Sequence, residues 1–392
     1  GLQNRISMDF VYALAQEAAE GVLLEEAINS VKEKSGLRKL MELSIEILKG
    51  IKESPDLNSL FEKTIQRIYE ISEKHQVAQY QHIKDVTNQV LEIIEKRSKE
   101  ERLVTGMPSG FIELDMLTTG FHPSDLVIIA ARPGMGKTSF MLSVAMNLAL
   151  EEKVPLALFS LEMSKEQLVM RMLSMLSKVP LQNIRKGFIS EEDWEKLLNA
   201  ALELSSCNIY IDDTPTLSTT ELRIKSRKLK KEKGIQIIFV DYLQLLRPPH
   251  RRSSRQEEVA EISRNLKALA KEISVPVVAL AQLSRQVEHR SDKRPQLADL
   301  RESGQIEQDA DLILFIHRPE YYKKNPPPEE EGIAEIIVAK QRQGPTGIVK
   351  LAFMKDTTMF KSLSPTYQSR VETYAPQELE EEISTEDYDF DF

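Results

Sequence analysis

The chain has 392 residues, of which 41% are hydrophobic and 29% charged, ordinary values for a soluble globular protein of two or three domains. No apolar stretch reaches the roughly 18 residues of a membrane-spanning helix, and the first residues lack the basic and apolar segments of a secretory signal. The single cysteine, Cys207, excludes an internal disulfide and favours the reducing cytoplasm, and the net charge of −9 argues against a uniformly basic nucleic-acid-binding protein.

The N-terminal quarter predicts helices only. Apolar residues recur at helical spacing, and we expect helices at the following positions: 9–20, 22–34, 37–50, 57–75 and 80–98. We interpret 1–78 as a partial all-α domain, a helical hairpin or bundle. Residues 79–102, which end in a run of charged side chains, are interpreted as a linker helix and hinge. Neither segment contains a candidate catalytic constellation.

From residue 103 the pattern changes to short apolar runs that alternate with helical segments. Strands are expected at 126–131, 155–161, 209–211, 235–241, 275–281, 311–316, 334–340 and 348–354. Helices are expected from 164 and at 190–206, 218–233 and 256–273. This alternation predicts an α/β domain over 103–366 with a parallel sheet and right-handed crossovers. Ligand chemistry is then expected at the carboxyl ends of the strands.

The last segment, 367–392, carries nine acidic side chains against one arginine, so the rest of the chain is close to neutral and has room for basic loops. Its composition predicts an acidic, disordered and solvating tail.

The stretch from Asp125 to Leu150 predicts a phosphate-binding loop between a buried strand and a helix. Gly134 and Gly136 allow the backbone to turn tightly and present N–H groups to phosphate at a helix N-terminus. Lys137 and Thr138 are candidates for the β/γ-phosphates and Mg²⁺, respectively. The strict pattern G-x-x-x-x-G-K-[ST] is broken at its first position by an alanine. The alternative, a chance GK[ST] turn, is disfavoured by the flanking strand and helix.

Three further strand ends carry polar side chains. Asp241 follows an apolar strand and suits a carboxylate in the Mg²⁺ shell. Glu162 is a candidate for orienting or deprotonating the water that attacks the γ-phosphate. Gln282 is a candidate γ-phosphate sensor. Taken singly, each of these residues is equally well explained as a helix cap or an ordinary strand end.

Two basic loops follow strands at the expected ligand edge. The first contains Arg251, Arg252 and Arg255, and the second begins at Arg285. They predict contacts with nucleic-acid phosphates rather than with bases, because almost no aromatic residues are interleaved. A separate strand end carries two cations, at 340 and 342, ahead of a Gly-Pro turn, which is either an interface feature or a surface basic pair.

Seven segments occur in a characteristic order: ARPGMGKTSF, FSLEMS, VDYLQLL, EISRNLKALAKE, ALAQLSR, DLRESGQIEQDADLILFIHR and AKQRQGPTG. Together they resemble the replicative DNA helicases of the bacterial DnaB family over essentially all of 103–365, and an alanine at position 131 is usual in that family. Residues 8–98 resemble the end of the family's N-terminal domain and its linker helix. The chain therefore looks N-terminally truncated, because the family normally has several tens more residues upstream.

The resemblance implies a RecA-type motor that works as a ring of six copies. It implies ATP with Mg²⁺ bound between subunits, 5′ to 3′ translocation on single-stranded DNA at the replication fork, and primase and a helicase loader as partners. The candidate nucleotide residues are Gly134, Gly136, Lys137, Thr138, Ser139, Glu162, Arg171, Asp241 and Gln282, with Lys340 and Arg342 reaching into the neighbour's site, Arg342 as an arginine finger. The candidate DNA-gripping residues carried over from the family are Arg301, Glu302 and Gly304.

Two alternatives remain at the level of sequence. One is a recombination ATPase of the RecA or RadA/Sms kind, against which no four-cysteine zinc motif and no C-terminal protease-like domain are found. The other is a binding module, in which the helical region docks a partner and ATP only gates assembly. Such a module would bind ATP without DNA-stimulated turnover.

Overall fold

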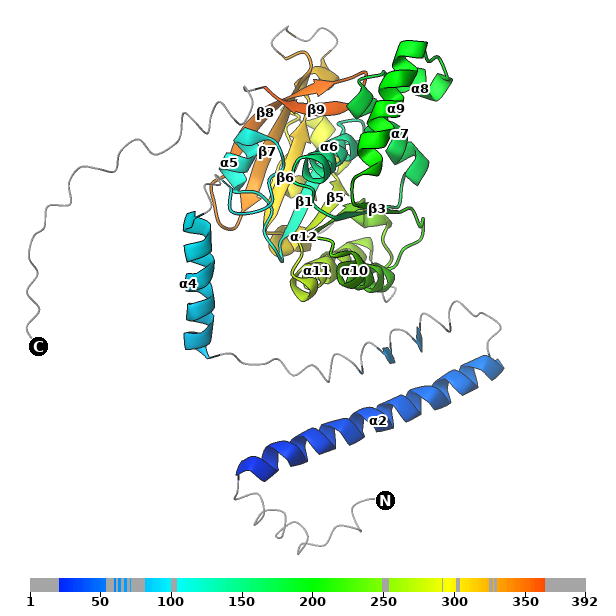
Figure 1. Cartoon of the computed structure of the whole chain (residues 1–392), viewed down its shortest axis with the longest axis vertical. Coiled ribbons are helices and arrows are strands. Elements are labelled where there is room, and N and C mark those ends of the chain that lie inside the picture. The colour runs from blue at the N-terminus through cyan, green and yellow to red at the C-terminus, as the bar shows by residue number, and fades with distance from the viewer. Residues whose placement is uncertain are drawn as a thin grey trace, which may run out of the picture. The chain divides into compact units, whose positions relative to one another are not determined.

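The computed structural model describes residues 21–53, 82–99, 104–248, 254–290, 292–300, 304–323 and 330–363, with isolated positions at 60, 63, 64, 67, 68, 71 and 327. The chain divides into two units, Gly1–Glu95 and Lys96–Phe392; Figure 1 labels helices and strands of each. The predicted helix at 9–20, most of that at 57–75 and the acidic tail lie outside the described residues.

The first unit contains one long helix where the sequence predicts two. Helix α2 runs unbroken from Gly21–Glu53 and replaces the expected helices at 22–34 and 37–50. A Ser-Gly pair at 35–36 suggests a break, but a glycine inside a helix costs only about 1 kcal/mol relative to alanine, so helical propensity on both sides prevails. Helix α4 (Ile83–Lys99) agrees with the helix predicted at 80–98.

The second unit is built on one nine-stranded sheet with the order β3-β2-β4-β5-β1-β6-β7-β8-β9. Its strands are β1 (Leu126–Ala131), β2 (Leu156–Ser160), β3 (Ile209–Asp212), β4 (Ile237–Asp241), β5 (Val277–Gln282), β6 (Leu312–His317), β7 (Ile333–Gln341), β8 (Gly347–Met354) and β9 (Met359–Ser362). Strands β1 to β6 are parallel, as predicted. The sheet lies at the centre of this unit in Figure 1.

The prediction of a wholly parallel sheet is wrong for the last third of the sheet. Strands β7, β8 and β9 pair antiparallel, and β9 was not predicted. The physical reason is the length of the connections. A parallel crossover needs a dozen or more residues, whereas β7 and β8 are joined by a tight Gly-Pro turn and β8 and β9 by four residues. The connection between β6 and β7 is 15 residues long, so its length does not explain the antiparallel pairing of those two strands.

Helices cover both faces of this sheet. They are α5 (Ile112–Thr118), α6 (Lys137–Leu150), α7 (Lys165–Ser177), α8 (Leu181–Lys186), α9 (Glu191–Ser205), α10 (Thr219–Lys233), α11 (Arg255–Ile273) and α12 (Gly304–Asp309), with short 3-10 segments η1 (Leu243–Leu245), η2 (Arg285–His289), η3 (Leu297–Leu300) and η4 (Pro319–Tyr322). Alternate residues of β1 enter two separate hydrophobic clusters, because side chains of a strand point to opposite faces. One cluster contains α5, α6 and α7, and the other contains α10 and α11.

Helix α6 is buried on nearly all sides, so its position in the domain is fixed by packing. Phe140 is completely buried, stacks on Phe111 at a centroid distance of 5.4 Å and meets the edge of Phe360 at 5.3 Å. The helix therefore cannot shift without opening an aromatic core. Lys137 and Thr138, the first residues of the helix, are therefore held in a fixed position as well.

No helix in the described part of the chain is long and apolar enough to cross a membrane.

We predict that Phe140→Ala lowers the free energy of unfolding by about 3–5 kcal/mol, because it removes a fully buried ring and leaves a cavity. Chemical denaturation followed by circular dichroism measures this change. Phe188→Ala is the matched control, because the same ring is deleted at a side chain that is 72% exposed. Equal losses in the two variants contradict the packing argument.

Candidate nucleotide-binding site

The loop between β1 and α6 has the conformation that phosphate binding requires. Gly134 and Gly136 have φ values of +80° and +98°, a region that other residues adopt only with strain. A Cβ on Gly136 would also lie 3.2 Å from the ring of Phe360. The strict motif has a glycine at position 131, where this chain has alanine. Ala131 is the last residue of β1 and is fully buried in a regular strand, so its backbone conformation does not require glycine.

A buried acid lies directly against the loop. The hydroxyl of Thr138 donates to Oδ2 of Asp241 at 2.7 Å, and Asp241 is only 1% exposed. Burial raises the pKa of Asp241 to about 6, with the Thr138 hydrogen bond opposing the rise. Burial lowers the pKa of Lys137, whereas Asp241 and Glu162 raise it. The ammonium of Lys137 donates to the carbonyl of Ala131 at 3.3 Å, so it already lies inside the turn of the loop.

These residues fit a nucleotide with Mg²⁺. Oδ1 of Asp241 is buried and has no hydrogen-bond partner among the described residues, so it is an oxygen ligand that still needs a counter-charge. The described residues contain no cluster of three or more acidic, His or Cys side chains for a metal. Mg²⁺ suits this arrangement, because it is usually held by one or two protein carboxylates together with substrate phosphates. Ser139 is buried in the first turn of α6.

The sheet brings the other predicted strand ends to the same edge. Ser160 pairs with Asp241 and Ala131 pairs with Gln282, so β2 ends level with β4 and β1 ends level with β5. Because Val240 pairs with Ala279, all four ends lie at the same edge, with β5 running two residues beyond Asp241. Glu162 is exposed just beyond β2, and Gln282 is exposed at the end of β5. Arg171 comes from α7, and its guanidinium donates to the Thr358 hydroxyl at 3.4 Å.

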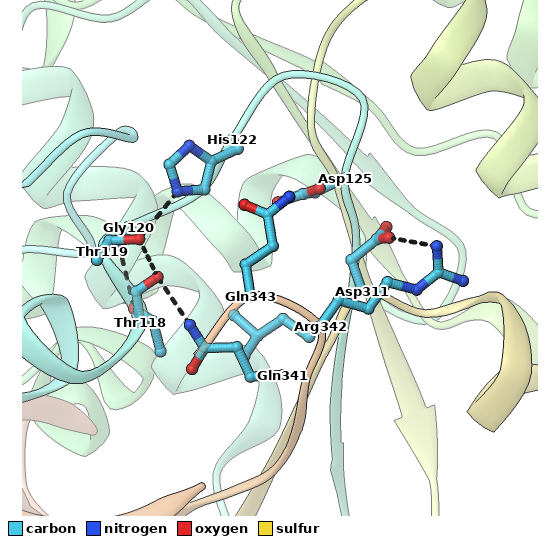
Figure 2. A pocket seen from close by; sticks show the side chains of 10 residues that line it. Thr118, Thr119, Gly120, His122, Asp125, Asp311, Gln341, Arg342 and Gln343 are labelled. Carbon is cyan, nitrogen blue, oxygen red and sulfur yellow. Dashed lines mark hydrogen bonds and ion pairs between the residues drawn. The ribbon is translucent and has the colours of Figure 1, made fainter. Parts of the chain in front are cut away.

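Lys340 and Arg342 lie at the opposite edge of the sheet, where the parallel strands β1 and β6 begin. Gln341, at the end of antiparallel β7, pairs with Leu312 at the start of β6, which in turn pairs with Val127 near the start of β1. The guanidinium of Arg342 lies 3.4 Å from Oδ1 of Asp311, and both residues line a pocket together with Asp125 and Gln341, as Figure 2 shows.

Both cations are held by the end of α12. Arg342 donates to the carbonyl of Gln308 at 3.0 Å. Lys340 donates to the carbonyls of Ala310 at 2.7 Å and Glu307 at 2.5 Å. Burial lowers the pKa of Lys340, with nearby Arg342 acting in the same direction.

The candidate DNA-binding residues are described only in part. Arg251, Arg252, Arg301 and Glu302 lie outside the described residues. Arg285 is exposed at the start of η2, and Gly304 begins α12 with open space around it. Arg255 begins α11 but contacts its own chain, donating to Glu258 at 2.9 Å and to the carbonyl of Gln244.

Sequence reasoning missed three residues that shape the loop. Arg132 is 7% exposed and donates to Glu288 at 2.9 Å and to the carbonyl of Leu283 at 2.8 Å, which ties the loop to the segment after β5. Arg318 and Tyr321 come from beyond β6 and lie beside Gly134. A charged residue at the end of an apolar strand was a usable signal for Arg132, whereas nothing in the sequence marks the other two.

A glycine loop with Lys-Thr at a helix start, facing a buried strand-end acid, defines a P-loop nucleotide-binding domain with a RecA-like sheet. Comparison with known proteins narrows this class. Residues 106–362 match the family described as the DnaB-like helicase C-terminal domain. The replicative DNA helicase DnaB of Geobacillus stearothermophilus is 45% identical over 358 residues, which cover 91% of this chain and 78% of that protein. The replicative DNA helicase DnaC of Bacillus subtilis (strain 168) has the same identity and coverage.

Solved structures agree with the sequence comparison. One of them, described as an ATPase domain, superposes with a TM-score of 0.68 at 44% identity and covers 73% of this chain and all of that one. A DnaB-like replicative helicase, solved in a study of its interactions with primase, superposes with a TM-score of 0.72 at 38% identity and covers 91% and 83% of the two chains. The chain belongs to the DnaB-like replicative helicases, a family that implies ATP-dependent helicase activity. The resemblance found from the sequence motifs is thereby confirmed.

We predict that Gly136→Ala weakens ATP binding at least about tenfold, because the new Cβ meets Phe360 and the backbone must leave the conformation that points N–H groups at phosphate. Titration with a fluorescent ATP analogue measures the affinity. Gly187→Ala is the control: its φ is +73°, but no atom lies within 4 Å of the added Cβ. A Gly136→Ala protein that binds like this control contradicts the loop geometry.

Proposed function

We propose that the protein is an ATP-driven ring helicase, in which six copies translocate 5′ to 3′ on single-stranded DNA at the replication fork and hydrolyse ATP between subunits. Residues 103–366 form the motor in this proposal, 79–102 the linker and 1–78 the helical N-terminal region. One observation carries the proposal: the P-loop and Arg342 lie at opposite edges of one sheet.

The separation of these halves follows from strand direction. Val127, next to the Arg342 edge, and Ala131, next to the P-loop, are about 13 Å apart at about 3.3 Å per residue. The side chain of Arg342 is also held next to the start of β1: it donates to the carbonyl of Gln308 and pairs with Asp311, whose carboxylate accepts from the N–H of Leu126. It is therefore unsuited to its own nucleotide but suited to that of a neighbour packed head to tail. Repeated head-to-tail contacts close into a ring when the rotation permits.

Each residue at the P-loop edge then has a role that its position supports. The main-chain N–H groups of Gly134 and Gly136, with Ser139 in the following turn, bind phosphate oxygens, and Lys137 neutralises their charge. Thr138 and Asp241 hold Mg²⁺, which when bound polarises the phosphates and offsets the charge that develops on them. The remaining roles are assigned as follows: Glu162 orients the attacking water, Gln282 senses the γ-phosphate, and Arg171 supports the nucleotide side.

Residues at the opposite edge act on the nucleotide bound by the neighbouring subunit. Arg342 acts as the arginine finger, which makes hydrolysis depend on assembly. Lys340 anchors the same turn through the carbonyls of α12 and adds positive charge next to the neighbour's phosphates. Leaving Asp311 for a triphosphate is favourable for Arg342, because the phosphate carries more negative charge than one carboxylate.

We assign DNA binding to loops on the channel side of the ring. The assigned residues are Arg251, Arg252, Arg255, Arg285, Arg301, Glu302 and Gly304. Contacts of this kind are made to the backbone, so binding is expected to fall steeply with salt and to show little base preference. Primase is the proposed partner, supported by the related helicase structure solved in a study of interactions with primase. A helicase loader and a cytoplasmic location belong to the same proposal.

We predict that Arg342→Ala and Lys137→Ala are each inactive in DNA-stimulated ATP hydrolysis, but that mixing them restores turnover. A mixed ring contains interfaces where an intact P-loop meets an intact finger, about one quarter of all interfaces if subunits mix at random. Steady-state hydrolysis with and without single-stranded DNA, with the oligomer mass recorded, measures this recovery.

Lys350→Ala is the control for loss of a cation, because Lys350 is exposed on β8, away from the turn that carries Arg342. It should keep wild-type turnover. A mixture that stays inactive although mixed rings form would show that both groups act within one subunit, and the shared-site proposal would be wrong.

We predict that the protein unwinds a duplex that carries a 5′ single-stranded tail on the strand it encircles, and that a duplex with only a 3′ tail is not opened. Strand release from the two substrates, followed by fluorescence with ATP and Mg²⁺ present, tests the polarity. Lys137→Ala, which lacks the phosphate-binding ammonium, should release neither substrate. Unwinding from the 3′ tail would reverse the proposed direction.

A further inference from the structure

The exposed end of β5 is held by a side chain from outside the sheet. Strands β4 and β5 pair only as far as Val240 and Ala279; β4 ends at Asp241, whereas β5 continues to Gln282, which leaves a gap with no described strand beside the end of β5 on this side. Gln244, in η1, fills the gap. Its Oε1 accepts a hydrogen bond from the main-chain N–H of Gln282 at 3.3 Å, and its Nε2 donates to the main-chain carbonyl of Gln282 at 3.2 Å.

The same residue is also in contact with α11. The main-chain carbonyl of Gln244 accepts a hydrogen bond from the guanidinium of Arg255, at the start of α11, and a second nitrogen of that guanidinium donates to Glu258 at 2.9 Å. Gln244 therefore touches both the proposed γ-phosphate sensor, Gln282, and a proposed DNA-phosphate ligand, Arg255. Among the described contacts it is the shortest connection between these two residues.

We propose that Gln244 is a positioning residue that couples γ-phosphate sensing at Gln282 to DNA-phosphate binding at Arg255. The inference rests on the proposed function of these two residues and adds the physical link between them. Gln244 itself touches neither the nucleotide nor DNA in this mechanism. It acts by fixing where the main chain of Gln282 lies.

The coupling follows from competition for Arg255. In the structure, one partner of Arg255 is a neutral carbonyl, and a DNA phosphate is a stronger acceptor for a guanidinium. When a DNA phosphate binds the guanidinium of Arg255, the hydrogen bond from Arg255 to the carbonyl of Gln244 in η1 is lost. Because both ends of the Gln244 amide are bonded to Gln282, a shift of η1 moves the main chain that carries the sensor.

The opposite side of the β5 end is fixed. Leu283, the residue after the sensor, is bonded through its carbonyl to buried Arg132 and through its N–H to the carbonyl of Ala131. The P-loop side of this segment is therefore anchored, and the side that faces Gln244 is the one able to respond. By linkage, a γ-phosphate bound at Gln282 must change the affinity of Arg255 for DNA by the same factor as DNA changes the affinity for nucleotide.

Glutamine is the side chain that this position requires. Its amide offers a donor and an acceptor at once, which matches the N–H and C=O of one residue. Glutamate offers only acceptors and would place a carboxylate oxygen against the carbonyl of Gln282. Asparagine has the same amide but is shorter by one methylene.

The test measures coupling rather than activity. The dissociation constant of the full chain for a fluorescent oligothymidine is determined by anisotropy at fixed salt, with Mg²⁺ and with or without a non-hydrolysable ATP analogue. The ratio of the two constants is the coupling factor, and factors of about 5–150 are typical of coupled sites. We expect Gln244→Ala to reduce the wild-type ratio at least about fivefold, towards one, with Gln244→Asn behaving alike.

Asn265→Ala is the matched control. Asn265 lies on the same helix as Arg255, and its amide donates to the hydroxyl of Thr219 at 3.3 Å, so the variant loses a side-chain amide hydrogen bond away from the sensor. We expect its ratio to stay within about twofold of wild type, because a contact outside the network should not carry coupling.

A double variant separates a specific link from a general loosening. Arg255→Ala should lower both DNA affinity and the ratio, and Gln244→Ala added to it should lower the ratio no further, because the two residues act in one chain of contacts. An additive loss in the double variant would mean that Gln244 acts by some other route, and the inference would be wrong.

The remaining outcomes are equally decisive. A Gln244→Ala ring with the wild-type ratio overturns the inference, and so does an equal loss in Asn265→Ala. If Gln244→Ala does not assemble, Gln244→Asn provides the same comparison. If the wild type shows neither nucleotide-dependent DNA binding nor DNA-stimulated hydrolysis, the proposed function fails, and this inference fails with it.

Discussion

The central strand β1 is the constraint on which the rest of the motor depends. All six of its residues are fully buried, and it pairs in parallel with β5 on one side and β6 on the other. Its register sets Ala131 level with Gln282 at one edge and Val127 level with Leu312 near the other. A slip of one residue would move Val127, Ile129 and Ala131 into the cluster that now holds Leu126, Ile128 and Ala130, and would shift the P-loop by about 3.3 Å relative to Gln282. The P-loop, the end of β5 and the start of β6 take their positions from this strand directly, and β4 and β7 take theirs through β5 and β6.

The site at the P-loop edge contains charged groups whose burial costs free energy unless a ligand of opposite charge binds to them. Asp241 is buried, its pKa is raised to about 6, and one of its oxygens has no partner among the described residues. Lys137 is partly desolvated, so burial lowers its pKa. An acid and a base in these surroundings both gain when a metal ion and a phosphate provide opposite charges. The glycine loop adds N–H groups, and the packed ring of Phe140 keeps α6 from moving away.

Much of the motor domain follows from local pattern. All eight predicted strands are present, because apolar runs bounded by turn residues are typical of buried strands. The P-loop and the polar ends of β2, β4 and β5 also follow from spacing along the chain. The predictions fail at three places. Helix α2 continues through a Ser-Gly pair, β7 and β8 run antiparallel, and the short segment that forms β9 carries no recognisable strand pattern, although it pairs with β8 at the edge of the sheet. Gln244 was missed because its proposed role depends on a hydrogen bond to Gln282, which is 38 residues away along the chain.

The sequence by itself determined which residues are candidates for binding phosphate and which family the chain belongs to, because glycines, strand-end acids and their order are local properties. Tertiary structure alone decided the edge on which each group lies. Arg342 and Lys137 carry equally plausible charges for a triphosphate, yet an antiparallel turn sends one of them to the far edge of the sheet. Similarly, Arg132 meets Glu288 across 156 residues of chain. Such contacts depend on strand order and direction, which spacing along the chain does not encode.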